Sequence, residues 1–446
     1  MLKKILIANR GEIALRILRA CKELDIRTVV VHSTADEKEM FVRLADESVC
    51  IGPPQVKNSY LNIPSIISAA TIANVDAIHP GIGMMSENHN FAKIVNDHGF
   101  KFIGPNHKDI ENMSNKIKAK EFANKIGLPI VPGGKKNIKN ISDAKKVAQE
   151  VGYPVLIKAT NGGGGRGIKK VYDESELSEN LSLARKEAIQ SFGNDEVYIE
   201  KFIENPRHIE VQIIGDKLGN IIHVGERECS IQRRSQKVIE ECPSPGISND
   251  ERKRICEITV NAFKKIGYQS LGTVEYLYSK GNFYFIEMNT RLQVEHTVTE
   301  EVYKIDIVKE QIFIASGKEL SIQQEDVREK CYSIECRINA ENPITLFPST
   351  GMVTTYHPPG GPGIRVDSLL YSGCSVTAFY DGLVSKIIST GNTRTECIMR
   401  LKRALDEYVI EGIDTNISSL KKIISHDDFI NCNFDISWFD KILENN

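Results

Sequence analysis

"FYFIEMNTRLQVEH", residues 283–296, alternates apolar with polar side chains along most of its length. Its polar series is Glu287, Asn289, Arg291, Gln293 and Glu295, and its apolar series is Ile286, Met288, Leu292 and Val294. Side chains on a β-strand point alternately to opposite faces, so an extended segment would place the five polar groups on one face. A half-solvated antiparallel strand is typically built the same way, and the pattern alone leaves that ordinary explanation open.

The residues before this stretch predict a β-hairpin that turns at Lys280, Gly281 and Asn282. A turn there places Glu275 about opposite Glu287. Two carboxylates side by side repel by about 1 kcal/mol in water and by about 4 kcal/mol at an effective dielectric near 20. A cation between them would remove this repulsion, and Asn289 adds a third oxygen ligand. The hairpin therefore predicts a site for Mg²⁺ or Mn²⁺, with water and the phosphates of a nucleoside triphosphate as further ligands.

A second segment, KATNGGGGRG (residues 158–167), is suited to contacts with phosphate. Four consecutive glycines let backbone N–H groups approach a phosphate without obstruction by side chains. Lys158 and, upstream, Lys116 offer cations for the α- and β-phosphates. The flanking strand patterns predict a β-hairpin lid, and the Walker A motif is absent. A glycine run is equally typical of a surface turn, so the phosphate site is a hypothesis at this point.

Two further segments would bind a nucleotide only if the fold places them beside one. The strand VYIEKFI (residues 197–203) could hydrogen-bond an adenine along its edge, and an ordinary amphipathic strand has the same pattern. The segment SIQRRSQK gathers Gln232, Arg233, Arg234 and Lys237. A solvated basic face is the usual explanation of such a run. Beside a phosphate, the same cations would stabilise the transition state of phosphoryl transfer.

Length and composition indicate a globular enzyme. The 446 residues suit two to four domains, and 41% hydrophobic with 26% charged residues is ordinary for a soluble protein. A net charge of −2 does not indicate nucleic acid as a partner. No apolar run approaches the roughly 20 residues that a membrane helix needs. Ten scattered cysteines without a C-x-x-C motif predict reduced thiols in a cytoplasmic protein.

The chain begins with a β-α-β pattern, which predicts a parallel sheet with helices on both faces. Six motifs then occur in an order that resembles the biotin carboxylase family of the ATP-grasp superfamily: IANRGEIALRI, IHPGIGMMSEN, KATNGGGGRGI, SIQRRSQKVIEE, FIEMNTRLQVEHTVTE and ECRINAENP. The resemblance runs from residue 3 to about residue 415. Its most specific part is EMNTRLQVEH combined with RINAENP, because the glycine run is shared across ATP-grasp enzymes.

The resemblance implies an α/β protein with the ATP-grasp fold. It implies an N-terminal parallel-sheet (Rossmann-like) domain at residues 1–113. An ATP-grasp subdomain with a small glycine-rich lid is expected at residues 114–203, and the ATP-grasp catalytic subdomain at residues 204–330. A C-terminal α+β domain is expected at residues 331–446.

The resemblance also assigns roles to individual residues, transferred position by position. ATP would be bound by Lys116, Lys158, Gly164, Gly165, Glu200, Lys201, Ile203, His208, Ser235, Glu275, Leu277 and Glu287. The metal would be held by Glu275, Glu287 and Asn289, in agreement with the hairpin argument. Bicarbonate would be held by Lys237, Arg291, Val294 and Glu295. Glu295 would be the general base, Arg337 would stabilise the biotin enolate, and Ile82 would lie beside biotin.

The implied reaction is ATP-dependent carboxylation of biotin by bicarbonate, through carboxyphosphate, giving ADP and phosphate. No Met-Lys-Met-type segment is present, so biotin is expected on a separate carrier protein. Carboxyltransferase subunits, as in the acetyl-CoA carboxylase of fatty acid biosynthesis, are the other expected partners. Family members are commonly homodimers through the first helix and the segment after PPGG, and we expect a dimer here. Arg16, Arg19, Glu23 and Arg365 are present at the expected interface, whereas Pro362 replaces a usual aromatic residue. The carboxyl acceptor is chosen by a different polypeptide and is not encoded in this chain.

Three positions depart from the family pattern: Ile82 replaces Tyr, Ser235 replaces His and Thr297 replaces Pro. Losing one neutral hydrogen bond costs about 0.5–1.5 kcal/mol, so these changes would weaken biotin binding without abolishing it. They would also suit an ATP-grasp ligase that carboxylates a different nitrogen nucleophile, which is the main alternative. A non-catalytic ATP-binding protein is a third hypothesis, and the retained base Glu295 argues against it.

Overall fold

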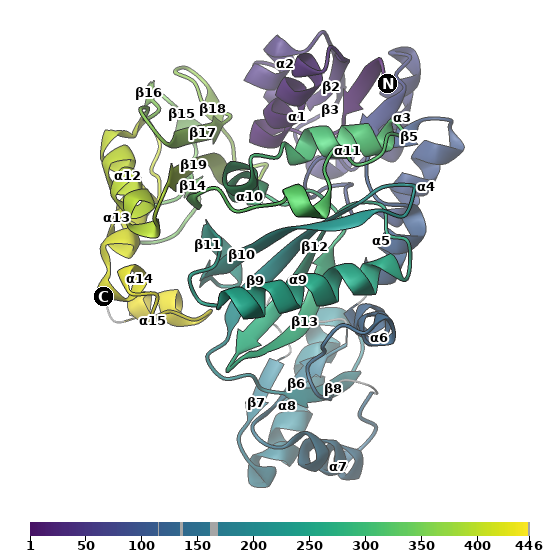
Figure 1. The fold of residues 1–446 in the computed structure, drawn as a ribbon, viewed down its shortest axis with the longest axis vertical. Helices are drawn as coiled ribbons and strands as arrows, with labels where there is room; N and C mark the ends of the chain where they lie inside the picture. Colours follow the sequence, from purple (N-terminus) through teal and green to yellow (C-terminus); the bar gives the residue numbers. More distant parts are fainter. Residues whose placement is uncertain (115, 134–136, 161–167, 445–446) are drawn as a thin grey trace.

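The N-terminal residues form the parallel sheet that the sequence predicts. The computed structural model describes residues 1–114, 116–133, 137–160 and 168–444. Its first unit contains β1 (Lys4–Ile7), α1 (Gly11–Glu23), β2 (Arg27–Ser33), α2 (Met40–Leu44), β3 (Glu47–Gly52), α3 (Ile63–Ile72), β4 (Ala77–His79), α4 (His89–Asp97), β5 (Lys101–Phe102) and α5 (His107–Ser114). The strands pair in parallel in the order β3-β2-β1-β4-β5. Ile5 packs with Ile17 of α1, whereas Leu6 packs with Ile66 of α3, so helices cover both faces (Figure 1).

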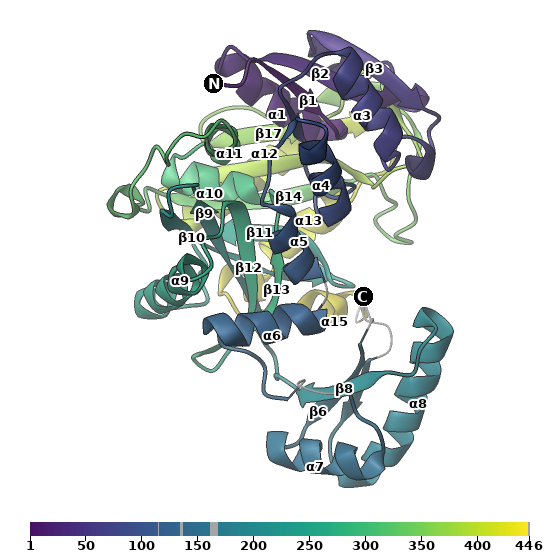
Figure 2. The same ribbon diagram turned by 90° about the vertical axis from the view of Figure 1, so that its right-hand side faces the viewer.

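A small unit projects from one end of the molecule, below the rest in Figures 1 and 2. It contains α7 (Ile141–Val151), β6 (Val155–Ala159), β7 (Ile168–Val171), α8 (Glu174–Phe192) and β8 (Val197–Lys201). Its antiparallel sheet has the order β7-β6-β8 and its own hydrophobic core. The strands β6 and β7 pair as the predicted hairpin. The glycine run between them, residues 161–167 with Gly164 and Gly165, lies outside the described residues.

The central layer is one antiparallel sheet of eight strands, in the order β13-β12-β9-β10-β11-β14-β19-β17. These strands are β9 (Arg207–Gly215), β10 (Ile221–Arg233), β11 (Gln236–Cys242), β12 (Ser270–Ser279), β13 (Asn282–Asn289), β14 (Tyr332–Asn339), β17 (Ile364–Ser368) and β19 (Leu383–Gly391). The helices packed around its first strands are α6 (Lys116–Ile126), α9 (Asn249–Lys264), α10 (His296–Tyr303) and α11 (Ile307–Ala315). The pairing of β11 with β14 carries the sheet across the boundary expected at residue 330.

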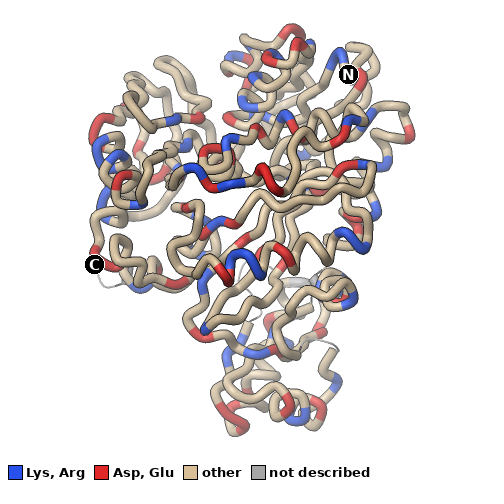
Figure 3. The backbone as a smooth tube through the Cα atoms, viewed as in Figure 1, with Lys and Arg blue, Asp and Glu red and all other residues tan. Residues whose placement is uncertain are grey.

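The C-terminal residues complete a second core beside this sheet. They form β15 (Gly351–Met352), β16 (Thr355–His357), β18 (Ser375–Val376), α12 (Arg394–Glu407), β20 (Val409–Glu411), α13 (Ile417–Ser425), α14 (Asp427–Ile430) and α15 (Trp438–Glu444). All ten cysteines are free. Acidic and basic residues are interspersed along the chain in every unit (Figure 3). No helix in the described part of the chain is both long and apolar enough to cross a membrane.

Candidate active site

The β12–β13 hairpin has the predicted geometry. Lys280 and Gly281 form the turn with positive φ angles of 50° and 80°, as a tight two-residue connection requires. The register places Glu275 directly opposite Glu287. Glu275 is buried and Glu287 is half-buried, and their opposed positions place both side chains on the same face of the hairpin.

The prediction of one extended strand through residue 295 is wrong. The strand β13 ends at Asn289, and Glu295 is the N-cap residue of α10. The chain leaves the sheet because Leu292 packs into the core shared with the N-terminal unit. Glu87 of that unit holds the departing segment, because it accepts hydrogen bonds from the Thr290 N–H (3.2 Å) and from Arg291 Nε (2.8 Å).

The polar side chains of this segment nevertheless converge. Asn289 Nδ2 and Gln293 Nε2 both donate to Glu275 Oε1, at 2.8 and 3.1 Å. Arg291 donates to Asn289 Oδ1 and to Gln293 Oε1, each at 2.9 Å. The polar groups that the sequence pattern assigned to one face of a strand therefore come from three elements: the end of β13, the loop after it and the N-terminus of α10.

Lys237 of β11 lies at the centre of the cluster. Its ammonium donates to Glu210 (2.5 Å), Glu275 (2.9 Å) and Glu295 (2.6 Å). Burial lowers the pKa of Lys237, but the three carboxylates outweigh burial and hold the pKa well above its ordinary value. Lys237 is therefore a permanent cation that links the metal-ligand candidate Glu275 to the base candidate Glu295.

Glu295 is fully buried between cations. Lys237 binds its Oε1, and Arg337 of β14 donates to its Oε2 at 3.0 Å. Burial raises the pKa of Glu295, but Lys237, Arg337 and Arg227 together hold the pKa well below the ordinary carboxyl value. Arg337 is itself fixed by a second hydrogen bond, from its Nε to Glu240 at 2.5 Å.

The residues near Glu275 fit a divalent cation on chemical grounds. His208, Glu210 and Glu275 each offer a ligand atom, and within the described ranges these atoms lie within 4.8 Å of one another. His208 Nε2 is 3.1 Å from Glu275 Oε2. The predicted set of Glu275, Glu287 and Asn289 consists of hard oxygen donors, as Mg²⁺ prefers. Glu210 is a further carboxylate that the sequence argument did not include.

Glu200 of β8 lies at the centre of the predicted nucleotide-binding residues of the small unit. Its buried carboxylate forms ion pairs with Lys158 of β6 and with Lys120 of α6. Burial raises the pKa of Glu200, but the two lysines outweigh it and lower the pKa. The ammonium of Lys201 points elsewhere and donates to the carbonyls of Gly152 (2.9 Å) and Tyr153 (2.8 Å).

The other predicted nucleotide ligands differ in their burial and in their position in the fold. Ile203 is buried, and Leu277 is half-buried opposite His208 in the β9–β12 register. Lys116 is the first residue of α6, and its side chain lies outside the described part of the structure. Ser235 is exposed at the tip of the β10–β11 hairpin, where Arg234 and Ser235 adopt positive φ angles of 48° and 65°.

The basic residues around Ser235 do not form one cluster in the structure. Arg233 forms a bidentate pair with Glu341 at 2.9 and 2.8 Å, whereas Lys237 lies in the central cluster. The backbone carbonyl of Ile82 accepts a hydrogen bond from Asn9 Nδ2 at 2.9 Å, and the side chain packs against the N-terminal core. Val294 accepts a hydrogen bond at its carbonyl from Lys386 Nζ, at 2.7 Å.

The contributors that the sequence argument missed include Glu210, Lys386 and Lys120. Glu210 has a signal of its own, because His208, Glu210 and Gln212 alternate with apolar residues as residues 287–295 do. Lys386 is fully buried, and its signal is a lone charge inside the apolar strand LVSKIIS. Lys120 lies in an ordinary lysine-rich helix and carries no comparable signal.

Comparisons with known proteins agree with this arrangement. Three family models match in order: biotin carboxylase N-terminal domain at residues 1–110, carbamoyl-phosphate synthase L chain ATP binding domain at 115–323, and biotin carboxylase C-terminal domain at 335–441. Biotin carboxylase from Pseudomonas aeruginosa is 53% identical over 444 residues, covering 99% of each chain. Biotin carboxylase 1 from Bacillus subtilis is 50% identical over 443 residues, covering 99% of this chain and 98% of the relative.

Solved structures give the same result. A biotin carboxylase complex with β,γ-ATP from Campylobacter jejuni has a TM-score of 0.93 at 47% identity and covers 99% of each chain. The biotin carboxylase domain dimer of Hydrogenobacter thermophilus 2-oxoglutarate carboxylase, with MgADP, ADP and bicarbonate, has a TM-score of 0.91 at 46% identity, covering 99% of this chain and 98% of that one. With the three family models, the full-length relatives and the shared fold, this chain belongs to the biotin carboxylase family of the ATP-grasp superfamily.

Proposed function

We propose that the chain catalyses ATP-dependent carboxylation of biotin by bicarbonate, with biotin carried on a separate carrier protein. The observation that carries this proposal is the position of Glu295. Its carboxylate lies between Lys237 (2.6 Å) and Arg337 (3.0 Å), and Lys237 also binds Glu275. A potential base is thus fixed between a nucleotide–metal site and an arginine suited to a second substrate. A protein that only bound ATP would have no use for a base held in this way.

Glu295 is ionised before substrate enters, because three cations hold its pKa low. The carboxylate is therefore in the protonation state of a base but is a weak one. Bicarbonate bound by Lys237 and Arg291 would share their charge and so raise the proton affinity of Glu295. Glu295 then removes the bicarbonate proton, and the resulting oxyanion attacks the γ-phosphorus of ATP to give carboxyphosphate and ADP.

The metal site is proposed at Glu275, Glu287 and Asn289, with Glu210 and His208 next to it. A bound Mg²⁺ would neutralise charge on the β- and γ-phosphates there. Lys158 and Lys116 are proposed to contact phosphates, together with Gly164 and Gly165 of the glycine run. Glu200, Lys201, Ile203, His208 and Leu277 are proposed around the nucleotide. Arg337 would pair with the biotin enolate oxygen after carboxyphosphate decomposes, and Val294 would help hold bicarbonate.

The carrier protein and carboxyltransferase subunits are the proposed partners, in a homodimeric, cytoplasmic enzyme. The relatives serve different carboxylases: one 48% identical protein is named as part of a pyruvate carboxylase, and one solved neighbour belongs to a 2-oxoglutarate carboxylase. The choice of acetyl-CoA, pyruvate or another acceptor is therefore assigned to a partner. Acetyl-CoA carboxylase in fatty acid biosynthesis is the setting we favour.

The proposal is tested by mixing the protein with ATP, Mg²⁺, bicarbonate and free biotin, and following ADP release. We expect release that requires bicarbonate and is accelerated by biotin. Bicarbonate-dependent release that ignores biotin, but is accelerated by another ureido or amine compound, would favour a ligase for a different nitrogen nucleophile.

The change at Ser235 gives that alternative a direct test. Ser235 is exposed at a hairpin tip, so Ser235→His disturbs little packing. If biotin is the substrate, the imidazole should lower the KM for free biotin by about two- to tenfold, the effect of one hydrogen bond, with less effect on ATP. Arg234→His, at the neighbouring exposed position, is the control. An unchanged KM in Ser235→His would favour the alternative.

A further inference from the structure

The helix α10 begins directly after Glu295, the proposed base, which is its N-cap residue. The Glu295 carboxylate does not cap the helix, because its two oxygens are bound by Lys237 and Arg337. A side-chain cap stabilises the first turn of a helix, and a helix of eight residues, His296–Tyr303, has little stability of its own. The short helix that follows the base therefore starts without the restraint that such a cap gives.

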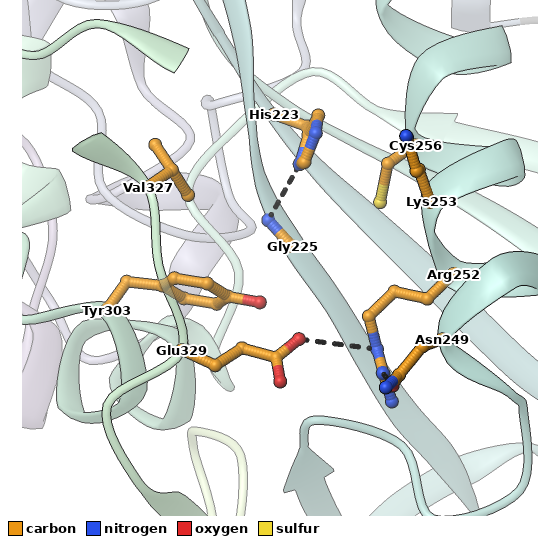
Figure 4. A pocket seen from close by; sticks show the side chains of 9 residues that line it. All are labelled: His223, Gly225, Asn249, Arg252, Lys253, Cys256, Tyr303, Val327 and Glu329. Atoms are coloured by element: carbon orange, nitrogen blue, oxygen red, sulfur yellow. Dashed lines mark hydrogen bonds and ion pairs between the residues drawn. The ribbon is translucent and has the colours of Figure 1, made fainter. Parts of the chain in front are cut away.

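Several other helices of the chain do begin with a side-chain cap. The caps of α3, α4, α7, α9 and α11 are Asn62, Asn88, Asn140, Ser248 and Asp306. In α10, Val298 and Val302 pack into the core, but apolar packing has no direction and does not by itself fix the first turn. The other end of the helix is packed less completely, because Tyr303 borders a cavity of about 340 Å³ (Figure 4). The position of Glu295 therefore depends on what holds the first turn.

Thr297, two residues after Glu295, ties this turn to the central sheet. Its hydroxyl donates a hydrogen bond to Oε2 of Glu335 on β14, and both residues are fully buried. Glu335 and Arg337 are two residues apart on β14, so their side chains lie on the same face of the sheet. The start of α10 is thus joined to β14 twice, by the Glu295–Arg337 bond at 3.0 Å and by the Thr297–Glu335 bond.

A third bond to the sheet holds the residue before Glu295. Lys386 of β19 lies directly opposite Arg337 in the β14–β19 register, and its ammonium donates to the Val294 carbonyl at 2.7 Å. Val294, Glu295 and Arg337 are all proposed to act on substrates, so their bonds are expected to change when substrates bind. Of the three bonds, only the one between Thr297 and Glu335 involves no residue with a proposed substrate contact. It is therefore suited to hold the turn throughout the reaction.

We propose that Thr297 is a positioning residue: its hydrogen bond to Glu335 fixes the first turn of α10 and so holds Glu295 between Lys237 and Arg337. Thr297 is also one of the three departures from the family pattern, which has proline there. Proline restrains the first turn of a helix through its fixed φ, without a hydrogen bond. Threonine and proline thus restrain the same turn by different physical means. The kinetic consequence rests on the proposed function, whereas the restraint itself does not.

The restraint is tested on the full chain by amide hydrogen exchange, measured by mass spectrometry on peptides that contain α10. Thr297→Val removes the hydroxyl and keeps the shape of the side chain, and should speed exchange in α10 about two- to tenfold, the effect of one hydrogen bond. Thr297→Ser keeps the hydroxyl and should exchange like the unchanged protein. Thr259→Val in α9 is the matched control, because Thr259 is also fully buried and its hydroxyl is bonded to Tyr276 at 2.7 Å. Normal exchange in Thr297→Val, or an equal increase in α10 of Thr259→Val, would overturn the proposal.

The kinetic consequence is tested by bicarbonate-dependent ADP release. Thr297→Val should lower kcat about three- to tenfold and leave the KM for ATP within about twofold, because no proposed nucleotide ligand lies on α10. Thr297→Ser and Thr259→Val should keep the normal kcat, and Thr297→Pro should stay within about threefold because its ring restrains the turn.

Three results would overturn the positioning role: a normal kcat in Thr297→Val, an equal loss in Thr259→Val, or a loss in Thr297→Pro as large as in Thr297→Val. The last result would mean that the hydroxyl itself is needed, and not the geometry of the turn. If the unchanged protein releases no ADP in response to bicarbonate, the proposed function fails, and the exchange experiment still decides whether Thr297 restrains α10.

Discussion

At the scale of single residues, Glu295 and Glu240 form an informative pair. Both carboxylates are fully buried and both accept a hydrogen bond from Arg337, but within the described structure only Glu295 is also bound by Lys237. The pKa of Glu295 is held well below its ordinary value, whereas burial raises the pKa of Glu240 to about 7. Neighbouring carboxylates thus differ in charge because they differ in the number of cations beside them.

The first prediction compares these two residues. Glu295→Gln should keep ATP binding but lower bicarbonate-dependent ADP release by about a hundredfold or more, because the proton acceptor is lost. Glu240→Gln, the matched control, should stay within about tenfold of the unchanged enzyme. Steady-state ADP release and a nucleotide-binding titration measure both. Equal losses in the two variants would contradict the role of Glu295 as the base.

The second prediction concerns Glu335, which lies directly opposite Glu240 in the β11–β14 register. Burial raises the pKa of Glu335 to about 8, above its unfolded value of roughly 4.3. A raised carboxyl pKa gives stability that is complete below the unfolded pKa and is lost as the pH rises through the folded pKa. Between pH 5 and 8 the unchanged protein should therefore lose about 3.5 kcal/mol of unfolding free energy relative to Glu335→Gln.

Urea unfolding at several pH values measures this difference. The exposed Glu179→Gln, on α8, is the control and should follow the unchanged protein. If Glu335→Gln shows the same dependence on pH as Glu179→Gln, Glu335 is not a protonated group in the folded protein.

At the scale of elements, the segment 290–294 carries Arg291 between two units of the fold. Glu87, from the loop before α4, accepts hydrogen bonds from the Thr290 N–H and from Arg291 Nε. Lys386 of β19 holds the other end of the segment through the carbonyl of Val294. A loop, in place of a strand, is therefore fixed at both ends by charged side chains from distant parts of the sequence.

The third prediction follows from this attachment. Glu87→Gln should raise the KM for bicarbonate about three- to tenfold with a small effect on the KM for ATP, because Arg291 loses an ionic partner that positions it. Glu341→Gln also weakens an Arg–carboxylate pair, with Arg233, but outside the segment, and should leave the bicarbonate KM unchanged. Steady-state kinetics, with each substrate varied in turn, measure both KM values. An equal change in the bicarbonate KM of Glu87→Gln and Glu341→Gln would contradict the assignment.

The sequence predicts local elements better than their ends. The turn at Lys280 and Gly281 and the opposition of Glu275 to Glu287 follow from local pattern, and both are confirmed. The end of β13 at Asn289 could not be predicted, because it depends on a distant core that takes up Leu292. Lys120 could not be predicted for the same reason, because its ion pair with Glu200 depends on how two distant segments pack together.

At the scale of the whole molecule, one eight-stranded sheet joins the central and C-terminal parts. Lys237 on β11 and Arg337 on β14 lie on adjacent strands of this sheet and meet at Glu295. The small unit with β6, β7 and β8 has a separate core and carries Lys158 and Glu200. The proposed carboxylation site is thus built on the continuous sheet, whereas two of the proposed nucleotide ligands, Lys158 and Glu200, lie on a unit with a core of its own.

The fourth prediction concerns assembly. Arg16 and Arg365, expected at a dimer interface, are already paired within the chain: Arg16 with Glu300 (2.7 Å) and Asp306 (2.6 Å), and Arg365 with Glu300 (2.9 Å). Pro362 also replaces a usual aromatic side chain. Because few new ion pairs remain to be made, we expect a weak dimer. Sedimentation should show dimer at about 10–50 μM protein, a range that detects micromolar association, and only monomer there would contradict this expectation.

The central claim, that Glu295 activates bicarbonate to attack the γ-phosphorus, is tested most directly with ¹⁸O-labelled bicarbonate. The unchanged enzyme is incubated with ATP, Mg²⁺, biotin and labelled bicarbonate, and the released phosphate is examined by mass spectrometry. If a bicarbonate oxygen bonds to phosphorus, one ¹⁸O should appear in each phosphate, and in Glu295→Gln labelled phosphate should form about a hundredfold more slowly. Phosphate that forms at the normal rate without ¹⁸O would mean that water attacks ATP instead, and would contradict the proposed mechanism.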